Sequence, residues 1–321
     1  PNGHKYKVTT AGTTASEPTW PTGDGATVTS GTAIFTEAGA GWQGGRILMR
    51  QPTAGGDCIP TSVNKYTGST AAPENGLWAL NDSLTYNVNL LSIPGGHWND
   101  GGTIKLWTSG DFGEVATKLC DLAEARSDSF AVIDPPIGLD VEGVINFHND
   151  PEGDGGFNSL TSNYGALYYP WIEVYDDIWG NNVFIGPSAF AVEAMAYTDY
   201  ISYPWFAPAG TGRGKVSSVV RAERNILQAD VDAMYGQGNA INPLRTFAGT
   251  GVVIWGQRTL QRVSTALDRI NVRRMLLTLR KLIANSVVPL VFEPDDPVLW
   301  REFRALVTPL LTHVQQHRGI K

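Results

Sequence analysis

Two apolar runs, separated by a stretch with helical spacing, organise the middle of the chain. The runs at 87–93 and 130–133 each stop at a turn that contains proline, as expected of buried strands. Between them, apolar residues recur along one face of a predicted helix at 113–126. The order strand, helix, strand predicts a βαβ unit with two parallel strands and a right-handed crossover.

The rest of the chain continues to alternate the two patterns. Residues 164–174 are aromatic and strand-like. Residues 241–260 fit a turn followed by two β-runs, then a glycine at which the chain can bend and a charged segment. The further predicted elements are helices at 187–200, 229–236, 271–287 and 297–317, a β-pair at 244–256 and a buried strand at 288–292. The predicted fold class is therefore α+β or α/β, with a mixed-sheet core and flanking helices.

The first 50 residues differ from the rest, because they are rich in Thr and Gly and poor in Leu. Short β-runs at 27–29 and 32–36 flank Ser30 and Gly31, which predict a hairpin turn. We expect residues 1–50 to form a small β-rich module at the end of an outer domain. Residues 51–321 are then the core domain.

The size and composition of the chain limit the kinds of protein to which it can belong. Its 321 residues and 34.7 kDa suffice for two domains with a sizeable core. No apolar run approaches the roughly 18 residues of a membrane helix, so membrane insertion is not expected. No secretory signal opens the chain, and since it begins without Met we expect a fragment or a processed form. Cys58 and Cys120 predict two buried thiols in a reducing compartment, a single disulfide being the alternative.

The charge is divided unevenly along the chain. Residues 1–200 hold 8 basic and 23 acidic residues, a balance of -15, whereas residues 201–321 hold 16 and 8, a balance of +8. This division predicts head-to-tail attraction between copies or a charged partner for the basic part, unless it is only drift in composition. Nucleic acid is not the expected partner, because the basic charges are few and the whole chain is acidic.

Two glycine-rich segments invite a nucleotide-binding interpretation and do not support it. The loop at 209–215 has Ala209 where a P-loop needs its first glycine and Val216 where it needs a hydroxyl. Gly249 and Gly251 begin a dinucleotide fingerprint, but Ile254 stands where the third glycine is required. We therefore expect no cofactor.

Metal-binding and catalytic patterns are also incomplete. Asp150, Glu152 and Asp154 match the start of a calcium loop, but Thr161 occupies the position of its bidentate acid, so a solvated turn is expected. His313 and His317 share a helix face near the chain end, where an exposed polar helix end is the simpler account. No metal site is expected.

The acidic cluster at 293–296 is the nearest approach to a catalytic pair. Glu293, Asp295 and Asp296 stand next to prolines and just before a predicted helix, so we expect Asp295 or Asp296 to cap that helix. No Ser-His-Asp or Cys-His pattern can be found, and His97 and His148 have no identifiable partner. We expect no catalytic residue and no enzyme.

An ordered series of short runs resembles the tail sheath proteins of contractile-tailed bacteriophages. The runs are GLWAL at 76–80, VNLLSIPG at 88–95, FAVIDPP at 130–136, ALYYPW at 166–171, GPS at 186–188, WFAPAG at 205–210, NPLRTFAGTGVVIWGQRTL at 242–260, NVRR at 271–274 and FEPDD at 292–296 with Leu299 and Trp300. Each run is weak alone, and their shared order over residues 55–318 carries the resemblance.

The resemblance implies a structural protein of the virion tail that is assembled in the host cytoplasm. Family members form hexameric rings that stack helically around a tail tube, and contraction, triggered by the baseplate, drives the tube through the host envelope. The expected partners are thus other copies of the chain, the tail tube protein and the baseplate. No nucleotide is required by this scheme.

Two further expectations follow from comparing this chain with the family. Family members continue past the last helix with β-strands that pair with neighbouring subunits, whereas this chain stops at Lys321. We therefore expect this chain alone to be monomeric or weakly associated in light scattering. We also expect the basic part to meet the tail tube or an adjacent subunit, through Arg269, Arg273, Arg274, Arg280 and Lys281.

Three other functions stay open at this point. One is an α/β enzyme of unknown reaction, with a cleft at the carboxyl ends of the parallel strands. The second is the sheath of a related contractile injection system. The third is a carbohydrate-binding module at residues 1–45, with Trp20 and Trp42 as stacking platforms, although core tryptophans are the simpler account.

Overall fold

The structure is a computed structural model that describes most of the chain after residue 76. The described residues are 4–10, 27–30, 33–40, 67–68, 76–83, 85–95, 97–100, 103–151, 159–177, 180–236 and 238–320. They fall into two compact units, one of Pro1–Ile59 with Glu173–Phe184 and the other of Pro60–Ile172 with Ile185–Lys321. Each unit is described by itself.

The smaller unit contains a three-stranded antiparallel sheet in the order β1-β3-β2. Its strands are β1 (His4–Thr10), β2 (Thr27–Ser30) and β3 (Ala33–Ala40). Ser30 pairs with Ala33, so two residues connect β2 to β3, and the predicted hairpin is confirmed. The same unit includes most of β9 (Ile172–Asp176) and β10 (Asn181–Ile185), which are hydrogen-bonded neighbours. Trp20 and Trp42 lie outside the described residues, and the assignment of residues 1–50 to an outer domain stays a prediction.

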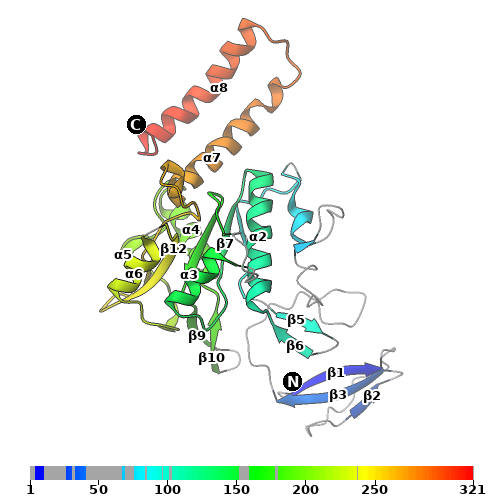
Figure 1. Ribbon diagram of the computed structural model, residues 1–321. Helices are drawn as coiled ribbons and strands as arrows, with labels where there is room; N and C mark the ends of the chain where they lie inside the picture. Colours follow the sequence, from blue (N-terminus) through cyan, green and yellow to red (C-terminus); the bar gives the residue numbers. More distant parts are fainter. Residues whose placement is uncertain are drawn as a thin grey trace. The chain divides into compact units, whose positions relative to one another are not determined.

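The larger unit is built on a five-stranded mixed sheet in the order β13-β12-β8-β7-β4 (Figure 1). Its strands are β4 (Leu90–Ser92), β7 (Phe130–Ile133), β8 (Gly165–Tyr169), β12 (Ile241–Phe247) and β13 (Gly251–Ile254). The first four run parallel, and β13 pairs antiparallel with β12. This mixed sheet with flanking helices confirms the predicted fold class.

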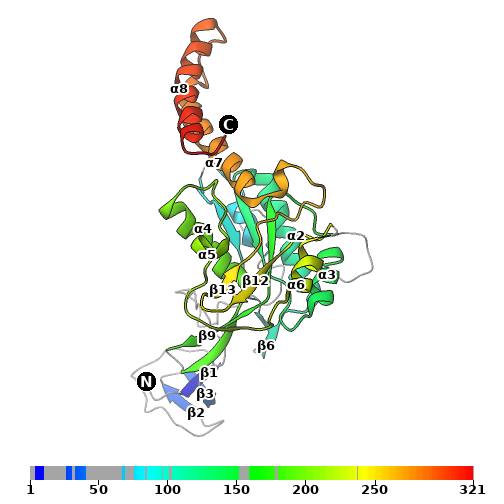
Figure 2. The same ribbon diagram turned by 90° about the vertical axis from the view of Figure 1, so that its left-hand side faces the viewer.

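Helices cover both faces of this sheet. They are α2 (Ser109–Arg126), α3 (Val141–Asn149), α4 (Pro187–Ile201), α5 (Gly210–Arg213) and α6 (Gln228–Tyr235). Figure 2 shows α4 and α5 on one face and α2, α3 and α6 on the other. The core between α2 and the sheet includes Leu119, Leu122, Ile133 and Leu167, each at most 2% exposed.

The predicted parallel pairing is confirmed, because β4 and β7 run parallel, with β5, β6 and α2 between them in the chain. The right-handed crossover stays a prediction. The helix begins four residues earlier than predicted, at Ser109. Thr108 and Asp111 form a capping box there, in which the Thr108 N–H donates to Asp111 over 2.6 Å and the Asp111 N–H donates to Thr108 over 3.4 Å. Short polar residues of this kind satisfy main-chain N–H groups that lack a partner within the helix.

The aromatic run at 164–174 is two strands rather than one. β8 ends at Tyr169, the peptide bond to Pro170 is cis, and β9 belongs to a different sheet from β8. Pro170 has no N–H to donate to a sheet ladder, which accounts for the break at this position.

The predicted strand at 288–292 is wrong. The segment forms the 3₁₀ turn η3 (Val288–Leu290), and Phe292 is 98% exposed. Apolar composition suggested a buried strand, but Pro289 lies two residues after the end of α7, and the chain continues there as a tight turn. This turn joins α7 (Ile270–Val287) to α8 (Pro297–Gln316), and the two helices form a hairpin that extends from the core (Figure 1).

The remaining elements are short. They are η1 (Gly76–Leu80), β5 (His97–Asp100), β6 (Thr103–Leu106), β11 (Val219–Ala222) and η2 (Ala266–Asp268). β5 and β6 pair antiparallel as a two-stranded sheet. Among the described residues, no helix combines the length and the apolar character that a membrane span requires.

Candidate functional site

The α7–α8 hairpin, with the residues that attach it to the core, is the candidate functional site, because it carries the basic residues expected to meet a partner. The chain enters it through residues 255–269, which follow β13. At this junction a buried carboxylate, Asp268, lies between Arg258 at 3.7 Å and Arg269 at 3.2 Å. Asp268 is 4% exposed, so its charge depends on these two guanidinium groups for compensation.

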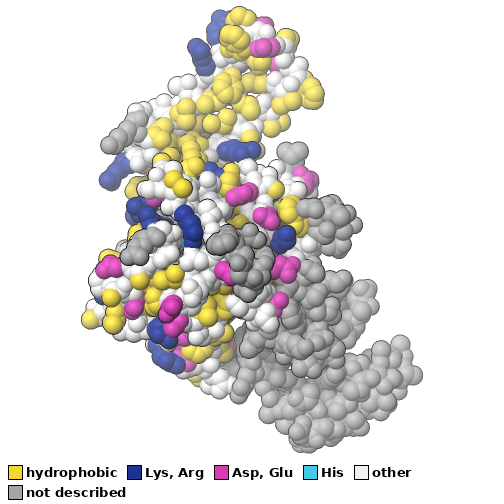
Figure 3. Space-filling model, in the orientation of Figure 1, with side chains coloured by type: hydrophobic (Ala, Val, Ile, Leu, Met, Phe, Trp, Pro, Cys, Tyr) yellow, Lys and Arg dark blue, Asp and Glu magenta, His cyan; other side chains and the backbone are white. Residues whose placement is uncertain are grey.

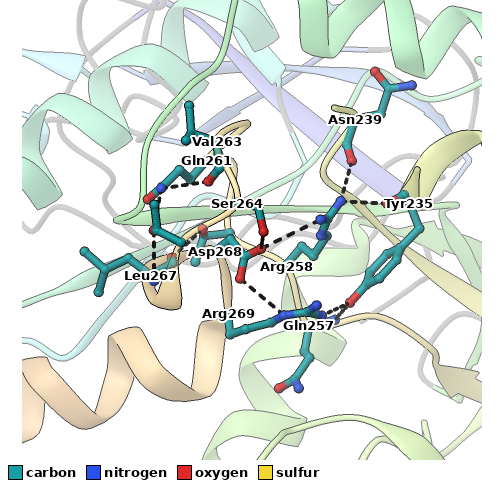
Figure 4. A network of polar contacts seen from close by, with 12 residues as sticks. Tyr235, Asn239, Gln257, Arg258, Gln261, Val263, Ser264, Leu267, Asp268 and Arg269 are labelled. Atoms are coloured by element: carbon teal, nitrogen blue, oxygen red, sulfur yellow. Dashed lines mark hydrogen bonds and ion pairs between the residues drawn. The ribbon is translucent and has the colours of Figure 1, made fainter. Parts of the chain in front are cut away.

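Tyr235, at the end of α6, completes the network around Asp268 (Figure 4). Its hydroxyl accepts a 3.0 Å hydrogen bond from Arg269, and its main-chain carbonyl accepts one of 2.7 Å from Arg258. The Arg258 guanidinium also lies over the Tyr235 ring. The exit from β13, the end of α6 and the start of α7 are therefore tied to one another.

Arg273 and Arg274 also point toward the core rather than toward solvent. Arg273 is 8% exposed, lies 3.4 Å above the centre of the Tyr164 ring, and has a pKa lowered by burial to about 10. Arg274 is 6% exposed and binds Asp199 of α4 over 2.5 Å. These two arginines fix the first turn of α7 against the sheet and against α4.

Lys281 attaches the middle of α7 to the segment that leads into β4. Its ammonium group donates to Asn87, to the Val88 carbonyl oxygen and to Asn89 over 2.6–3.0 Å, and lies 3.3 Å from Asp128. Asp128 in turn binds Arg126, whose Nε lies 2.9 Å from its carboxylate. Of the five basic residues predicted to meet a partner, only Arg280 is exposed on α7 without such an anchoring contact in the described residues.

The outer end of the hairpin carries an apolar surface. A groove of about 470 Å³ is lined by Val287, Leu290, Val291, Leu299, Trp300, Phe303 and Arg304. Val288, Val291, Phe292 and Trp300 are each more than half exposed. Figure 3 shows hydrophobic side chains gathered along the hairpin on the face toward the viewer. Large exposed apolar patches are uncommon on monomeric proteins and are found at contact sites for other proteins or ligands.

The inner end of the hairpin is packed by aromatic residues. Trp205 lies in a buried cluster with Met275, Leu279 and Val314, and its indole N–H donates to the His317 carbonyl oxygen over 2.9 Å. The rings of His313 and His317 lie against Tyr203, at 5.8 and 4.7 Å between ring centres. The described residues include no group of three metal-ligating side chains. The ring contacts with Tyr203 pack the end of α8 against the segment after α4.

The other sequence candidates are structural in the described residues. Asp296 caps α8, since its carboxylate accepts from the N–H groups of Val298 and Leu299 at 2.8 Å, as predicted. Gly249, in the turn between β12 and β13, and Gly251, the first residue of β13, take positive φ values of 77° and 89°. The loop at 209–215 contains α5. Cys120 is free and buried, whereas Cys58, Glu152 and Asp154 lie outside the described residues.

One cluster was not foreseen as a site, although its parts lie in three of the quoted runs. Asp134 directly follows β7, at the carboxyl edge of the parallel strands, where an α/β enzyme would hold its substrate. Its carboxylate accepts from the N–H and from the hydroxyl of Ser188, and the Ser92 hydroxyl donates to that of Ser188. The sequence gives a partial signal, because Ser92 is a polar residue within an apolar run and Asp134 directly follows another.

Comparison with known proteins identifies relatives of this chain. Residues 79–260 match the family model of the phage tail sheath protein central domain. The chain is 35% identical over 212 residues to the tail sheath protein of Vibrio phage KVP40, covering 62% of this chain and 31% of that protein. It is 29% identical over 200 residues to the tail sheath protein of Enterobacteria phage T4, covering 59% and 30%. It thus spans about a third of the length of the curated relatives that it matches.

Solved structures of contractile assemblies share the fold. A chain of the anti-feeding prophage baseplate aligns with a TM-score of 0.54 at 22% identity, covering 72% of this chain and 54% of that one. A chain of the sheath complex of an extracellular contractile injection system, in the contracted state, aligns with a TM-score of 0.52 at 19% identity, covering 88% and 84%. The family match extends over more than half of the sequence. The chain therefore belongs to the phage tail sheath protein family and contains its central domain.

Proposed function

We propose that this chain is part of the structural subunit of a contractile tail sheath. In this proposal, copies assemble as stacked hexameric rings around a tail tube in the tail of a virion. The sheath, triggered through the baseplate, then contracts to drive the tube through the host envelope. Family membership supports the sheath assignment, and the exposed apolar end of the α7–α8 hairpin is the observation that supports assembly.

The hairpin is well suited to join one copy to the next. Its anchoring side chains Arg273, Arg274 and Lys281 hold α7 to the core, so the outer end is carried on a fixed support. The groove that contains Trp300 and Phe303 has no cover in the described residues, and we propose that a second copy of this chain occupies it. The acidic balance of residues 1–200 and the basic balance of residues 201–321 favour a head-to-tail contact between copies.

A contact between two different surfaces of identical copies does not close on itself. Repetition of such a contact gives a closed ring or an open helix, depending on the rotation between neighbouring copies, and a sheath combines the two. Two alternative packings of the same copies would give an extended and a contracted form. Such a change needs no nucleotide and no metal. Of the predicted partner residues, we propose Arg280 for direct contact and Arg269, Arg273, Arg274 and Lys281 for orientation of the hairpin.

The test uses the intact protein of which this chain is part, with Phe292→Asp combined with Val291→Asp. We expect these charges at the outer end of the hairpin to abolish rings and tubes in electron microscopy and to leave a monomer in sedimentation velocity. Val263→Asp is the matched control, because Val263 is 68% exposed on a loop of the core. Tubes of normal length formed by the double variant would refute the proposed contact.

A second candidate is the sheath of a contractile injection system rather than of a phage. The fold similarity to the anti-feeding prophage and to an extracellular contractile injection system supports this candidate. Electron microscopy of particles from the source organism distinguishes the two, because a phage tail carries a DNA-filled head and an injection system does not. An α/β enzyme receives no support from Asp134, whose carboxylate is engaged by Ser188.

A further inference from the structure

We propose that Asp134, Ser188 and Ser92 form a proton-responsive latch that sets how firmly helix α4 is held to the central sheet. The latch joins segments that are far apart in sequence. Ser92 ends β4, Asp134 follows β7, and Ser188 lies in the first turn of α4. The hydrogen bonds of Ser188 to Asp134 and to Ser92 therefore join helix α4 to the strands β4 and β7.

The hydrogen bonds of the latch are short and form a chain. The Ser188 N–H donates to Asp134 Oδ1 over 2.6 Å, and the Ser188 hydroxyl donates to Asp134 Oδ2 over 2.7 Å. The Ser92 hydroxyl donates to the Ser188 hydroxyl oxygen over 2.8 Å. Asp134 is 5% exposed and Ser188 is fully buried, so water does not compete for these groups.

Helix α4 depends on this carboxylate for its N-terminal cap. The position before the helix is Gly186, which has no side chain to cap with, and Pro187 follows it. Asp134, 54 residues earlier in the chain, supplies the acceptor that a local Ser or Asp would otherwise provide. A negative charge at this end also interacts favourably with the helix dipole. The state of one carboxyl group therefore affects the attachment of the whole helix.

Among the described residues, the groups that face the Asp134 carboxyl are neutral. They are the hydroxyl and N–H of Ser188 on α4, the hydroxyl of Ser92 linked through it, and the N–H of Gly95 in the turn after β4. β4 and β7 carry no ionisable side chain. The charged residues of α4 are bound elsewhere, Glu193 to Ser217 and Asp199 to Arg274. Burial without a compensating cation raises the pKa of Asp134 from 3.8 to about 7, against the lowering effect of the Ser188 and Gly95 hydrogen bonds.

The hydroxyl groups of Ser188 and Ser92 can form hydrogen bonds with Asp134 and with each other whether Asp134 is ionised or protonated. When Asp134 is ionised, both serine hydroxyls donate toward it. When Asp134 is protonated, its O–H can donate to Ser188 and Ser188 can donate to Ser92, because a hydroxyl both donates and accepts. The pKa of Asp134 is higher in the folded chain than in the unfolded chain. Protonation of Asp134 therefore stabilises the state in which α4 is held to the sheet, and this stabilisation is lost as the pH rises toward 7.

Hydrogen exchange of the first turns of α4, measured on the 321-residue chain, tests the latch. After correction for intrinsic rates, we expect the protection of main-chain N–H groups in this region to fall about tenfold per pH unit between pH 5 and pH 7 and then to level off. Asp134→Asn should remove this dependence, because the amide keeps an acceptor for the Ser188 N–H and a donor for its hydroxyl. Glu142→Gln, which removes an exposed charge on α3, is the control and should behave as the parent chain.

Ser188→Ala provides a second test that retains the titrating carboxyl group. It removes the hydroxyl bond that lowers the pKa of Asp134, so the pH at which protection levels off should rise. An Asp134→Asn variant with the same pH dependence as the parent chain would overturn the proposal. If that variant does not fold, an unshifted transition in Ser188→Ala would overturn it instead.

Discussion

Lys281 donates a 2.6 Å hydrogen bond to the main-chain carbonyl oxygen of Val88, 193 residues earlier in the chain. The ammonium group thereby connects α7 to the segment that enters the edge strand β4. It is partly buried and is also paired with Asp128 at 3.3 Å. A basic helix that had suggested a partner surface is thus attached to its own core, and the outer half of the hairpin is left for contact.

Removal of this attachment should destabilise the larger unit. In Lys281→Met, three acceptors lose the Lys281 donor, and the mostly buried Asp128 carboxylate keeps only Arg126 of its two basic partners. We expect the free energy of unfolding to fall by about 2–3 kcal/mol in urea denaturation. Arg280→Met is the matched control on the neighbouring, exposed position and should change it by less than about 0.5 kcal/mol. Equal effects of the two variants would contradict the anchoring role of Lys281.

The glycine before α4 provides a steric test of the Asp134 cluster. A Cβ atom at Gly186 would overlap a carboxylate oxygen of Asp134, because the helix start lies directly against that side chain. We expect Gly186→Ala to lower the free energy of unfolding by about 1–3 kcal/mol, since the carboxylate must move away from Ser188.

Gly212 is the control for that measurement. A Cβ atom there meets nothing within 4 Å, and Gly212 has no positive φ value, so Gly212→Ala should be close to neutral. Thermal unfolding of both variants at one pH suffices for the comparison. A Gly186→Ala variant as stable as Gly212→Ala would show that the cluster tolerates a displaced carboxylate.

Local patterns in the sequence were sufficient for much of the fold. Uninterrupted apolar residues identified β7, helical spacing identified α2 and α7, and the Ser30 turn identified the β2–β3 hairpin. Each of these signals lies within the element that it describes. Such signals can therefore predict an element without knowledge of the other elements that it packs against.

The remaining features depended on partners far away in the chain. The apolar run at 288–292 is an exposed turn between α7 and α8 and pairs with no strand among the described residues, which apolar composition cannot reveal. Arg274 and Lys281 appeared free because Asp199 and Asn87 are remote in sequence. The Asp134 cluster was missed for the same reason, since its three side chains meet only when β4, β7 and α4 have assembled.

The buried His148 should lower the free energy of unfolding as the pH falls, whereas Asp134 should raise it. It is fully buried in α3, and burial, followed by the charge of Arg262, lowers its pKa from 6.5 to about 4. The folded chain therefore holds it neutral, whereas the unfolded chain takes up a proton below about pH 6.5. Stability is present above that pH and is lost as the pH falls toward 4. Between pH 6.5 and pH 4.5 the loss should be about 2 kcal/mol.

His148→Leu should remove this loss, because a leucine of similar size takes up no proton in either state. As the pH falls over the same range, protonation of Asp134 raises the free energy of unfolding. The measurement is therefore best made in an Asp134→Asn background, where that opposing change is absent. Urea unfolding at pH 4.5 and pH 6.5 then gives the difference directly. The double variant should show a smaller fall in unfolding free energy than Asp134→Asn alone. If the two fall equally, the buried imidazole is not the group whose protonation destabilises the fold in acid.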